Sequence, residues 1–275
     1  MRRLTSYRGL RALVTGASSG IGRLLALRFA REGARVGLVA RRTRELEQAA
    51  EEIRAGGSDA RVLACDVAER EQVDACVASA LEHFGGIDIL VNNAGYGHHR
   101  SFLERNVADM ERMLRVNFLG TLYFTKALLP QMVERGKGWL VFIASVAGRI
   151  ASPEESAYAA SKFAMVGLAE ALSLEVEGAG VHVLTVCPGA IRTPFFDEEA
   201  LRRMPPVALR SMVAPEGLVD AIVRGLAKGK RELTHPRSIA AGYVVRAFAP
   251  GFMRRQVRRF TLDAIEKSAR DSRID

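Results

Sequence analysis

Short apolar runs alternate with longer segments of helical character along most of this sequence. Strands are expected near residues 11–15, 35–40, 61–65, 87–91, 138–144 and 181–187, and helices near residues 20–32, 43–55, 69–84, 106–135, 156–177 and 215–228. Apolar, β-branched strands of this kind form parallel sheets that helices cover on both faces. The pattern therefore predicts an α/β fold built on a doubly wound parallel sheet.

A glycine-rich turn follows the first of these strands. The strand Arg11–Thr15 runs into Gly16-Ala-Ser-Ser-Gly20-Ile-Gly22, and a leucine-rich helix begins at once. Glycines let the backbone approach a pyrophosphate, and a helix N-terminus offers free N–H groups and the positive end of a dipole. This order is typical of the start of a Rossmann unit and predicts a dinucleotide site, although a glycine loop can also serve only a tight turn.

The end of the second strand indicates which dinucleotide binds. NAD enzymes usually carry an Asp or Glu there, which binds the ribose 2′-hydroxyl. This chain has Ala40, followed by Arg41 and Arg42. Without a carboxylate to repel a 2′-phosphate, and with a guanidinium able to bind one through paired hydrogen bonds, NADP(H) is favoured over NAD(H). The alternative is a solvated arginine pair at the start of the next helix.

Tyr158 and Lys162 are four residues apart in a predicted helix, and Ser145 precedes them. Residues at this spacing share one helix face. A cation close to a phenol lowers its pKa, so that the phenol can exchange a proton near neutral pH. These three groups suit the polarisation and protonation of a carbonyl. Alone, the Tyr/Lys spacing is a weak signal, because it arises by chance on many amphipathic helices.

Taken together, the motifs give a stronger signal. They are Thr15–Gly22, Asp66-Val67, Asn92-Asn93-Ala94-Gly95, Asn117, Ser145, Tyr158-x-x-x-Lys162 and Pro188-Gly189-Ala190-Ile191-Arg192-Thr193. In this order and spacing, the chain resembles a short-chain dehydrogenase/reductase of ordinary length. The resemblance implies a Rossmann fold and a homodimer or homotetramer formed through the two long helices near residues 106–135 and 156–177.

The resemblance also implies a role for each matching residue. The catalytic positions are expected to be Asn117, Ser145, Tyr158 and Lys162. In such enzymes Asn117 holds a relay water, Ser145 binds the substrate oxygen, and Tyr158 is the acid/base. Lys162 binds the ribose and lowers the pKa of the tyrosine. The cofactor is expected to contact Gly16, Ser18, Ser19, Gly20, Ile21, Gly22, Arg41, Arg42, Asp66, Val67, Asn93, Ala94, Gly95, Tyr158, Lys162, Pro188, Gly189, Ile191 and Thr193.

Composition limits the other possibilities. A chain of 275 residues with 48% hydrophobic residues can form one domain. The scattered Cys65, Cys76 and Cys187 indicate small core residues in a reducing compartment rather than disulfides or metal ligands, so a cytoplasmic location is expected. His98-His99 lacks ligand partners at metal spacing, and no metal is expected. No apolar run is long enough to span a bilayer, and no signal peptide is apparent.

The C-terminal region concentrates the positive charge. The net charge is +9, and residues 235–275 hold nine Arg or Lys against four Asp or Glu. We expect residues 1–235 to form the catalytic domain and residues 236–275 to form a basic, amphipathic extension. A basic amphipathic helix can lie on a membrane surface. Packing on the same domain or on a second subunit is favoured over membrane contact, and no nucleic-acid motif is present.

The substrate is less well defined by the sequence. Phe195, Phe196 and Met204 suggest an apolar lid, whereas Glu154-Glu155 disfavour a steroid. We expect a lipophilic ketone or aldehyde, or the corresponding alcohol, and therefore an NADP(H)-dependent oxidoreductase. Two alternatives stay open: a cofactor-binding sensor or scaffold, and a protein that docks to a membrane or a partner through its basic extension.

Overall fold

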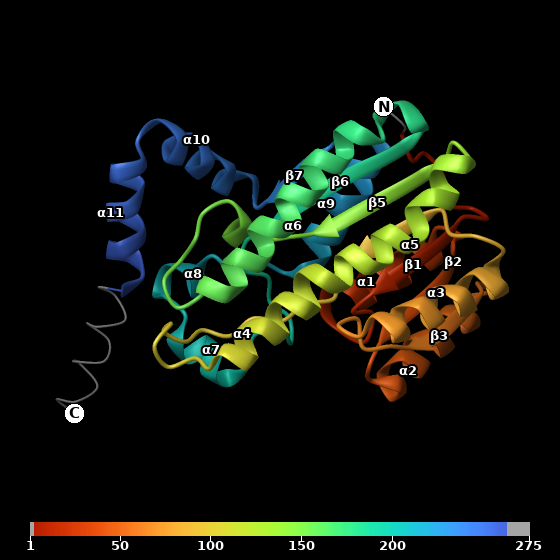
Figure 1. Ribbon diagram of the computed structural model, residues 1–275, viewed down its shortest axis with the longest axis horizontal. Coiled ribbons are helices and arrows are strands. Elements are labelled where there is room, and N and C mark those ends of the chain that lie inside the picture. The colour runs from red at the N-terminus through yellow and green to blue at the C-terminus, as the bar shows by residue number, and fades with distance from the viewer. Residues whose placement is uncertain (1–2, 263–275) are drawn as a thin grey trace.

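The computed structural model describes residues 3–262 of the chain (Figure 1). Its strands are β1 (Arg11–Thr15), β2 (Arg35–Ala40), β3 (Ala60–Ala64), β4 (Ile89–Asn92), β5 (Gly138–Ile143), β6 (Val181–Pro188) and β7 (Glu232–His235). They form one parallel sheet in the order β3-β2-β1-β4-β5-β6-β7. The predicted doubly wound parallel sheet is thus confirmed.

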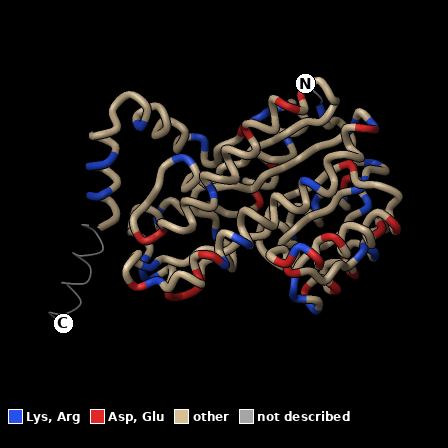
Figure 2. Tube along the Cα trace, in the orientation of Figure 1, with Lys and Arg blue, Asp and Glu red and all other residues tan. Residues whose placement is uncertain are grey.

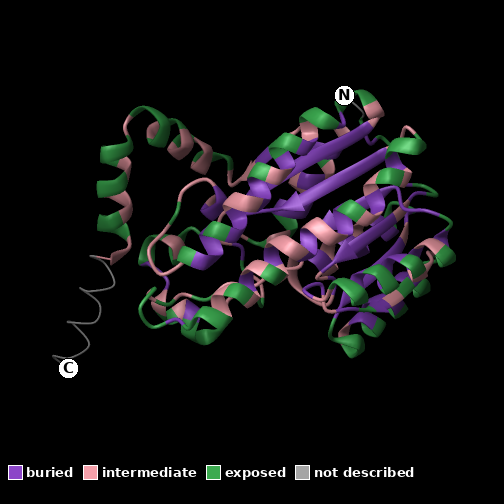
Figure 3. Ribbon diagram, in the orientation of Figure 1, coloured by how far each residue is buried: buried purple, intermediate pink, exposed green. Residues whose placement is uncertain are grey.

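Helices cover both faces of the sheet. They are α1 (Gly20–Arg31), α2 (Thr43–Ala55), α3 (Arg70–Phe84), α4 (Val107–Leu114), α5 (Gly120–Glu134), α6 (Ser156–Glu175), α7 (Glu198–Arg203), α8 (Pro206–Arg210), α9 (Pro215–Ala227), α10 (Ala240–Phe248) and α11 (Pro250–Phe260). One apolar cluster joins α1, α2 and α9 to the sheet, and a second joins α3, α5 and α6. Figure 3 shows the strands buried between these two layers.

Two features of the fold differ from the expectation. The strand β7 was not predicted; it pairs with β6 at the sheet edge, and only Leu233 among its residues is buried. The long helix expected over residues 106–135 is present from Val107 to Glu134, but it contains a π-helical turn at Arg115–Leu119 between α4 and α5. Such turns occur frequently at functional sites, and this one carries Asn117.

The strand order reverses between β1 and β4. The chain winds outward from β1 through β2 to β3, then returns to β4 on the other side of β1, with Val14 opposite Val91. Ligands of doubly wound sheets bind at such a reversal, beyond the carboxyl ends of the strands. The loops after β1, β4, β5 and β6 all lie at this edge, so the topology brings the predicted motifs together.

The C-terminal extension begins after β7. Helix α10 leads away from the sheet, and α11 stands apart from it (Figure 1). Arg246 of α10 donates to the carbonyl of Arg149, and its guanidinium lies 5.2 Å from the centre of the Phe163 ring. Residues 263–275, the end of the expected extension, lie outside the described part. Within residues 3–262, no helix is long and apolar enough to cross a membrane.

Candidate active site

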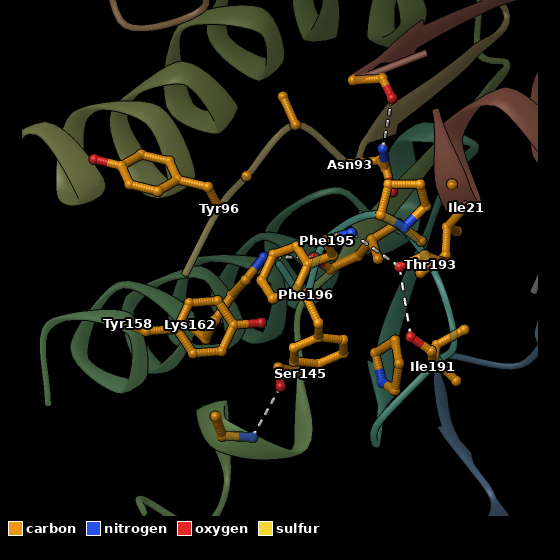
Figure 4. Close-up of a pocket in the computed structure, with 18 of the residues that line it drawn as sticks. Ile21, Asn93, Tyr96, Ser145, Tyr158, Lys162, Ile191, Thr193, Phe195 and Phe196 are labelled. Carbon is orange, nitrogen blue, oxygen red and sulfur yellow. Dashed lines mark hydrogen bonds between the residues drawn. The ribbon is translucent and has the colours of Figure 1, made fainter. Parts of the chain in front are cut away.

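A cavity of about 620 Å³ lies at the carboxyl edge of the sheet. Of the residues predicted to bind cofactor or to act in catalysis, all line this cavity except Gly22 and Asn117, which lie directly behind its wall. Figure 4 shows Tyr158, Lys162 and Ser145 gathered together, with Phe195 and Phe196 over them. The cavity therefore unites motifs that are far apart in the sequence.

The glycine loop is packed too closely for side chains. Gly16 has φ +66°, and a Cβ there would lie 2.7 Å from the side-chain nitrogen Nδ2 of Asn93. A Cβ on Gly22 would lie 2.4 Å from the Gly16 carbonyl oxygen. The Asn93 amide donates to the carbonyls of Thr15 at 3.0 Å and Gly16 at 3.3 Å, so the loop after β4 braces the loop after β1. The backbone can then come close to a ligand at this point.

The first turn of α1 faces the same cavity. At the start of α1, which lies within the described residues, the side chain of the N-cap residue Ser19 makes no capping hydrogen bond. The first turn of α1 contains no acidic residue. Arg42 instead donates to the hydroxyls of Ser18 at 2.9 Å and Ser19 at 2.8 Å. Free helix N–H groups beside a guanidinium suit a phosphate group. Arg41, the neighbouring arginine, is exposed and also lines the cavity.

Asp66 and Val67 line the cavity after β3. The Asp66 carboxylate pairs with Arg112 and accepts from the backbone N–H of Ala68 at 3.1 Å, which forms an Asx-turn. Val67 packs against the start of α5, where a Cβ on Gly120 would lie 2.8 Å from the carbonyl oxygen of Val67. Asp66 is therefore held in place by the fold at the position where the resemblance implies contact with the adenine.

Tyr158 and Lys162 project from one face of α6 into the cavity. Both are buried, and the Lys162 ammonium donates to the Ile143 carbonyl at 2.9 Å and lies 5.8 Å from the centre of the Tyr158 ring. Burial lowers the pKa of Lys162 to about 8. Burial also raises the pKa of Tyr158 above its ordinary value, while a hydrogen bond with Ser145 opposes that rise. The phenol therefore carries its proton at neutral pH in the protein alone.

Asn117 connects this helix to the loop after β4. It is fully buried, and its amide donates to the Tyr96 carbonyl at 2.9 Å and to the Ser161 hydroxyl at 3.0 Å. The Ser161 hydroxyl donates in turn to the Tyr158 carbonyl at 2.7 Å. A Cβ on Gly95 would lie 3.1 Å from the Asn117 side-chain oxygen. The π-turn thus positions an amide directly behind the cavity wall, linked to the backbone of the predicted acid/base.

The segment after β6 closes the other side. Pro188 ends the strand, and the Gly189 N–H donates to the His235 carbonyl at 2.8 Å. The Thr193 hydroxyl donates to the Ile191 carbonyl at 3.4 Å. Thr193 also approaches the glycine loop, because a Cβ on Gly20 would lie 3.3 Å from the Thr193 Cβ. These residues border the same space as the glycine loop and Tyr158.

An apolar wall forms the outer part of the cavity. Phe195 lies 5.8 Å from Tyr158 and 5.0 Å from Phe196, measured between ring centres. Met204 and Val207 line the same wall. This arrangement is typical of a pocket for a lipophilic group beside the predicted acid/base.

Sequence reasoning missed a polar pair inside this wall. The ring nitrogen of His99 lies 3.6 Å from a carboxyl oxygen of Glu155, and both side chains are largely buried. Burial raises the pKa of Glu155 to about 7. Burial and the nearby Arg203 and Arg105 lower the pKa of His99, so its ring is neutral at pH 7. The available signal was Glu155 itself, an acidic residue one helical turn before Tyr158.

The residues present fit a nicotinamide dinucleotide. The glycine cradle, which side chains would fill, and the uncapped first turn of α1 suit the pyrophosphate. Lys162 and Tyr158 lie further along the same cavity. Among residues 3–262, no group of three or more His, Cys, Asp or Glu side chains could hold a metal ion.

Comparison with known proteins identifies the family. The family description "short chain dehydrogenase" matches residues 11–203. Oxidoreductase UcpA of Salmonella typhimurium is 40% identical over 72% of this chain and 75% of its own, and the 3-ketodihydrosphingosine reductase of Bos taurus is 36% identical over 80% and 69%.

Solved structures agree with these sequence relatives. A short-chain dehydrogenase/reductase from Burkholderia phymatum in complex with NAD gives a TM-score of 0.82 at 26% identity, covering 89% of this chain and 95% of its own. One from Mycobacterium marinum gives 0.75 at 32%, covering 83% and 94%. The match spans every motif of the cavity, and the chain belongs to the short-chain dehydrogenase family of oxidoreductases.

Proposed function

We propose that this protein interconverts a lipophilic ketone or aldehyde and the corresponding alcohol with NADP(H), using Tyr158 as the acid/base. The observation that carries the proposal is the meeting of Tyr158, Ser145 and Lys162 in one cavity with the glycine loop and Arg41. A cofactor-binding scaffold would not need this set of groups beside an apolar pocket.

The side chains support a simple division of work. Ser145 and Tyr158 both line the cavity, and a substrate carbonyl oxygen can accept from both hydroxyls. In reduction Tyr158 gives its proton to that oxygen as the carbonyl carbon becomes an alcohol carbon; in oxidation it takes the proton back. The bound dinucleotide supplies the hydride for reduction and accepts it in oxidation.

Lys162 serves this proton transfer through its charge. An ammonium beside the phenol favours the phenolate that remains after protonation of the substrate. Its pKa of about 8 leaves part of the population neutral near that pH. The negative charge of a bound dinucleotide phosphate would favour the ammonium and strengthen its effect on Tyr158.

The choice of NADP(H) rests on Ala40 and Arg41. The strand β2 ends in a small apolar residue, so no carboxylate there binds the ribose 2′-hydroxyl of NAD or repels the 2′-phosphate of NADP. Arg42 is engaged with Ser18 and Ser19, which leaves the exposed Arg41 as the side chain best suited to a 2′-phosphate.

The apolar wall supports a lipophilic substrate. Phe195, Phe196 and Met204 offer the reacting centre an aromatic and aliphatic surface, and one relative of this chain is a 3-ketodihydrosphingosine reductase. The polar pair of Glu155 and His99 adds one place where a hydroxyl or amine of the substrate could bond.

The test is a screen of NADPH consumption over lipophilic ketones and aldehydes. Tyr158→Phe keeps the ring and removes the exchangeable proton. Turnover should therefore fall at least 1,000-fold, which corresponds to about 4 kcal/mol of activation free energy. NADPH should still raise the melting temperature of this variant. Tyr123→Phe in α5, away from the cavity, is the matched control and should keep its activity. Near-normal turnover of Tyr158→Phe on its best substrate would refute the proposal.

A further inference from the structure

Helices α10 and α11 carry apolar side chains that the described part of the chain leaves uncovered. Within residues 240–260 neither helix has a buried residue. Phe248 is 88% exposed, Val244 is 59% exposed, and Phe252 and Phe260 are each 47% exposed. Figure 3 shows both helices exposed or only half-buried along their length. Several large apolar side chains exposed on two adjoining helices are typical of an interaction surface.

The same surface is strongly basic. Residues 233–262 contain six arginines and no aspartate or glutamate. Arg254, Arg255 and Arg259 of α11 are exposed. Figure 2 shows this positive charge on the helices that stand apart from the domain. An occupant of this surface must therefore offer both an apolar medium and negative charge.

One end of this surface is anchored to the domain. Arg246 donates to the Arg149 carbonyl and lies over the Phe163 ring, and a Cβ on Gly242 would lie 3.2 Å from Ile150. These contacts hold α10 against the catalytic domain. The exposed phenylalanines and the arginines of α11 lie beyond this anchor (Figure 1).

A second copy of the chain does not match these requirements. Two such helices placed together would bring arginines against arginines, and the chain as a whole carries +9. An anionic bilayer surface does match, because its acyl boundary accepts aromatic side chains while its headgroups attract arginine. We propose that α10 and α11 form a docking surface for an anionic lipid bilayer.

The cavity opens beside this docking surface. Thr261, directly after α11, lines the cavity together with Val207 and Ala208 of α8. A bilayer in contact with α11 would therefore lie next to the apolar wall of the cavity. This position would allow a lipophilic compound to pass between bilayer and cavity with little exposure to water, but the docking itself does not depend on the proposed reaction.

Flotation of the full-length protein with lipid vesicles tests the proposal. Binding should be strong to vesicles of phosphatidylcholine and phosphatidylglycerol in equal parts, should weaken as salt rises, and should be at least 10-fold weaker with phosphatidylcholine alone. Exchange of Arg254, Arg255 and Arg259 for glutamine should weaken binding about fivefold per arginine, or ~1 kcal/mol each. Phe248→Ser with Phe252→Ser should weaken it about tenfold per residue.

Matched variants separate docking from general attraction. Exchange of Arg44, Arg61 and Arg70 for glutamine removes the same charge from exposed positions at the other end of the molecule, and should leave binding within about twofold of the parent. Phe102→Ser removes another exposed phenylalanine and should also have no effect. Unchanged melting temperatures would verify the fold of each variant.

Four results would overturn the proposal. One is the absence of binding to anionic vesicles. The second is equal weakening by the α11 and control arginine variants. The third is a drop in molecular mass for Phe248→Ser with Phe252→Ser in sedimentation without lipid, which would assign the surface to a second copy. Binding of single-stranded RNA in place of vesicles would likewise reassign it.

Discussion

Burial holds Glu155 in a protonation state that an exposed glutamate would not adopt at neutral pH. Its side chain is 19% exposed, and its pKa is raised from 4.5 to about 7 by burial. The neighbouring His99 is neutral and offers no compensating charge. This residue stands one helical turn before Tyr158, where its ionisation also acts against that of the phenol. Its titration therefore bears on both stability and activity.

The first prediction concerns stability and pH. Between pH 4.5 and 7 the folded protein holds a proton on Glu155 that the unfolded chain has lost, so stability falls as pH rises through this window and is constant above it. The loss attributable to this group is about 3 kcal/mol. Denaturant unfolding at pH 5 and pH 8 should show that Glu155→Gln removes this part of the loss.

Glu51→Gln provides the control for that measurement. Glu51 is exposed on α2, away from α6 and from the cavity, so its exchange should leave the difference between pH 5 and pH 8 as it is in the parent protein. An equal pH dependence for the parent and for Glu155→Gln would show that the carboxyl ionises normally in the folded state.

The second prediction separates the two arginines after β2. Arg41→Ala should weaken NADPH binding by about 1.5–3 kcal/mol, roughly 10- to 150-fold, and leave NADH binding nearly unchanged. Arg42→Ala should weaken both cofactors, because Arg42 braces Ser18 and Ser19 in the glycine loop. Calorimetric titration with both cofactors measures the effect.

Arg44→Ala is the control for the cofactor titration. This arginine is exposed in α2 and does not line the cavity, so neither affinity should change. Equal losses of NADPH and NADH binding in Arg41→Ala would contradict contact with a 2′-phosphate.

At the scale of elements, hydrophobic periodicity predicts the strands and helices whose formation depends on their own residues. It does not predict elements whose formation depends on contacts with distant parts of the chain. Six strands were expected within two residues of their observed bounds, because buried parallel strands are apolar throughout. The strand β7 carries Glu232, Thr234 and His235, and its pairing depends on the edge that β6 offers. The π-turn around Asn117 leaves the helical pattern almost unchanged, so nothing in the spacing marks it.

The same distinction applies to the cavity. Its glycine loop, Ser145 and Tyr158 follow from strand ends that a parallel sheet brings to one edge. His99 and Glu155 belong to two separate loops, joined where the Arg100 N–H donates to the Glu154 carbonyl at 3.0 Å. That contact is a product of the whole fold. The sequence shows an acidic residue before Tyr158 but does not indicate that it pairs with His99.

The third prediction uses two helical glycines with opposite surroundings. A Cβ on Gly225, inside α9, would meet Leu233 at 3.5 Å and Leu184 at 3.7 Å, which are ordinary contacts. Gly225→Ala should therefore stabilise the protein by about 0.5–1 kcal/mol. Gly22→Ala should destabilise it and abolish cofactor binding, because its Cβ would collide with the Gly16 carbonyl.

Denaturant unfolding of the two glycine variants measures both signs. Cofactor binding by Gly225→Ala should equal that of the parent, since α9 carries no residue of the cavity. If Gly225→Ala lowered the free energy of unfolding, the prediction for α9 would be wrong. If Gly22→Ala bound cofactor and were fully active, the glycine loop would be less tightly packed than the distances imply.

At the scale of the whole molecule, the proposed reaction and the proposed bilayer docking use different surfaces of the protein. The cavity occupies the carboxyl edge of the sheet, and the docking surface lies on α10 and α11 beside its opening. The outer faces of α4, α5 and α6 belong to neither. They still carry exposed apolar residues, with Leu174 of α6 65% exposed and Val133 of α5 41% exposed. These faces are therefore available for contact between subunits.

The last prediction is that the protein is at least a dimer through these helices. A dimer that buries Leu174 cannot accept a charge there without a partner, so Leu174→Arg should shift sedimentation toward the 30.0 kDa monomer. Phe248→Ser, on the docking surface, should leave the assembly intact, because that surface serves no subunit contact. A parent protein that sediments only as a monomer at micromolar concentration would contradict the prediction. If Phe248→Ser dissociated the assembly while Leu174→Arg did not, the subunit contact would instead lie on α10, and the membrane proposal would fail with it.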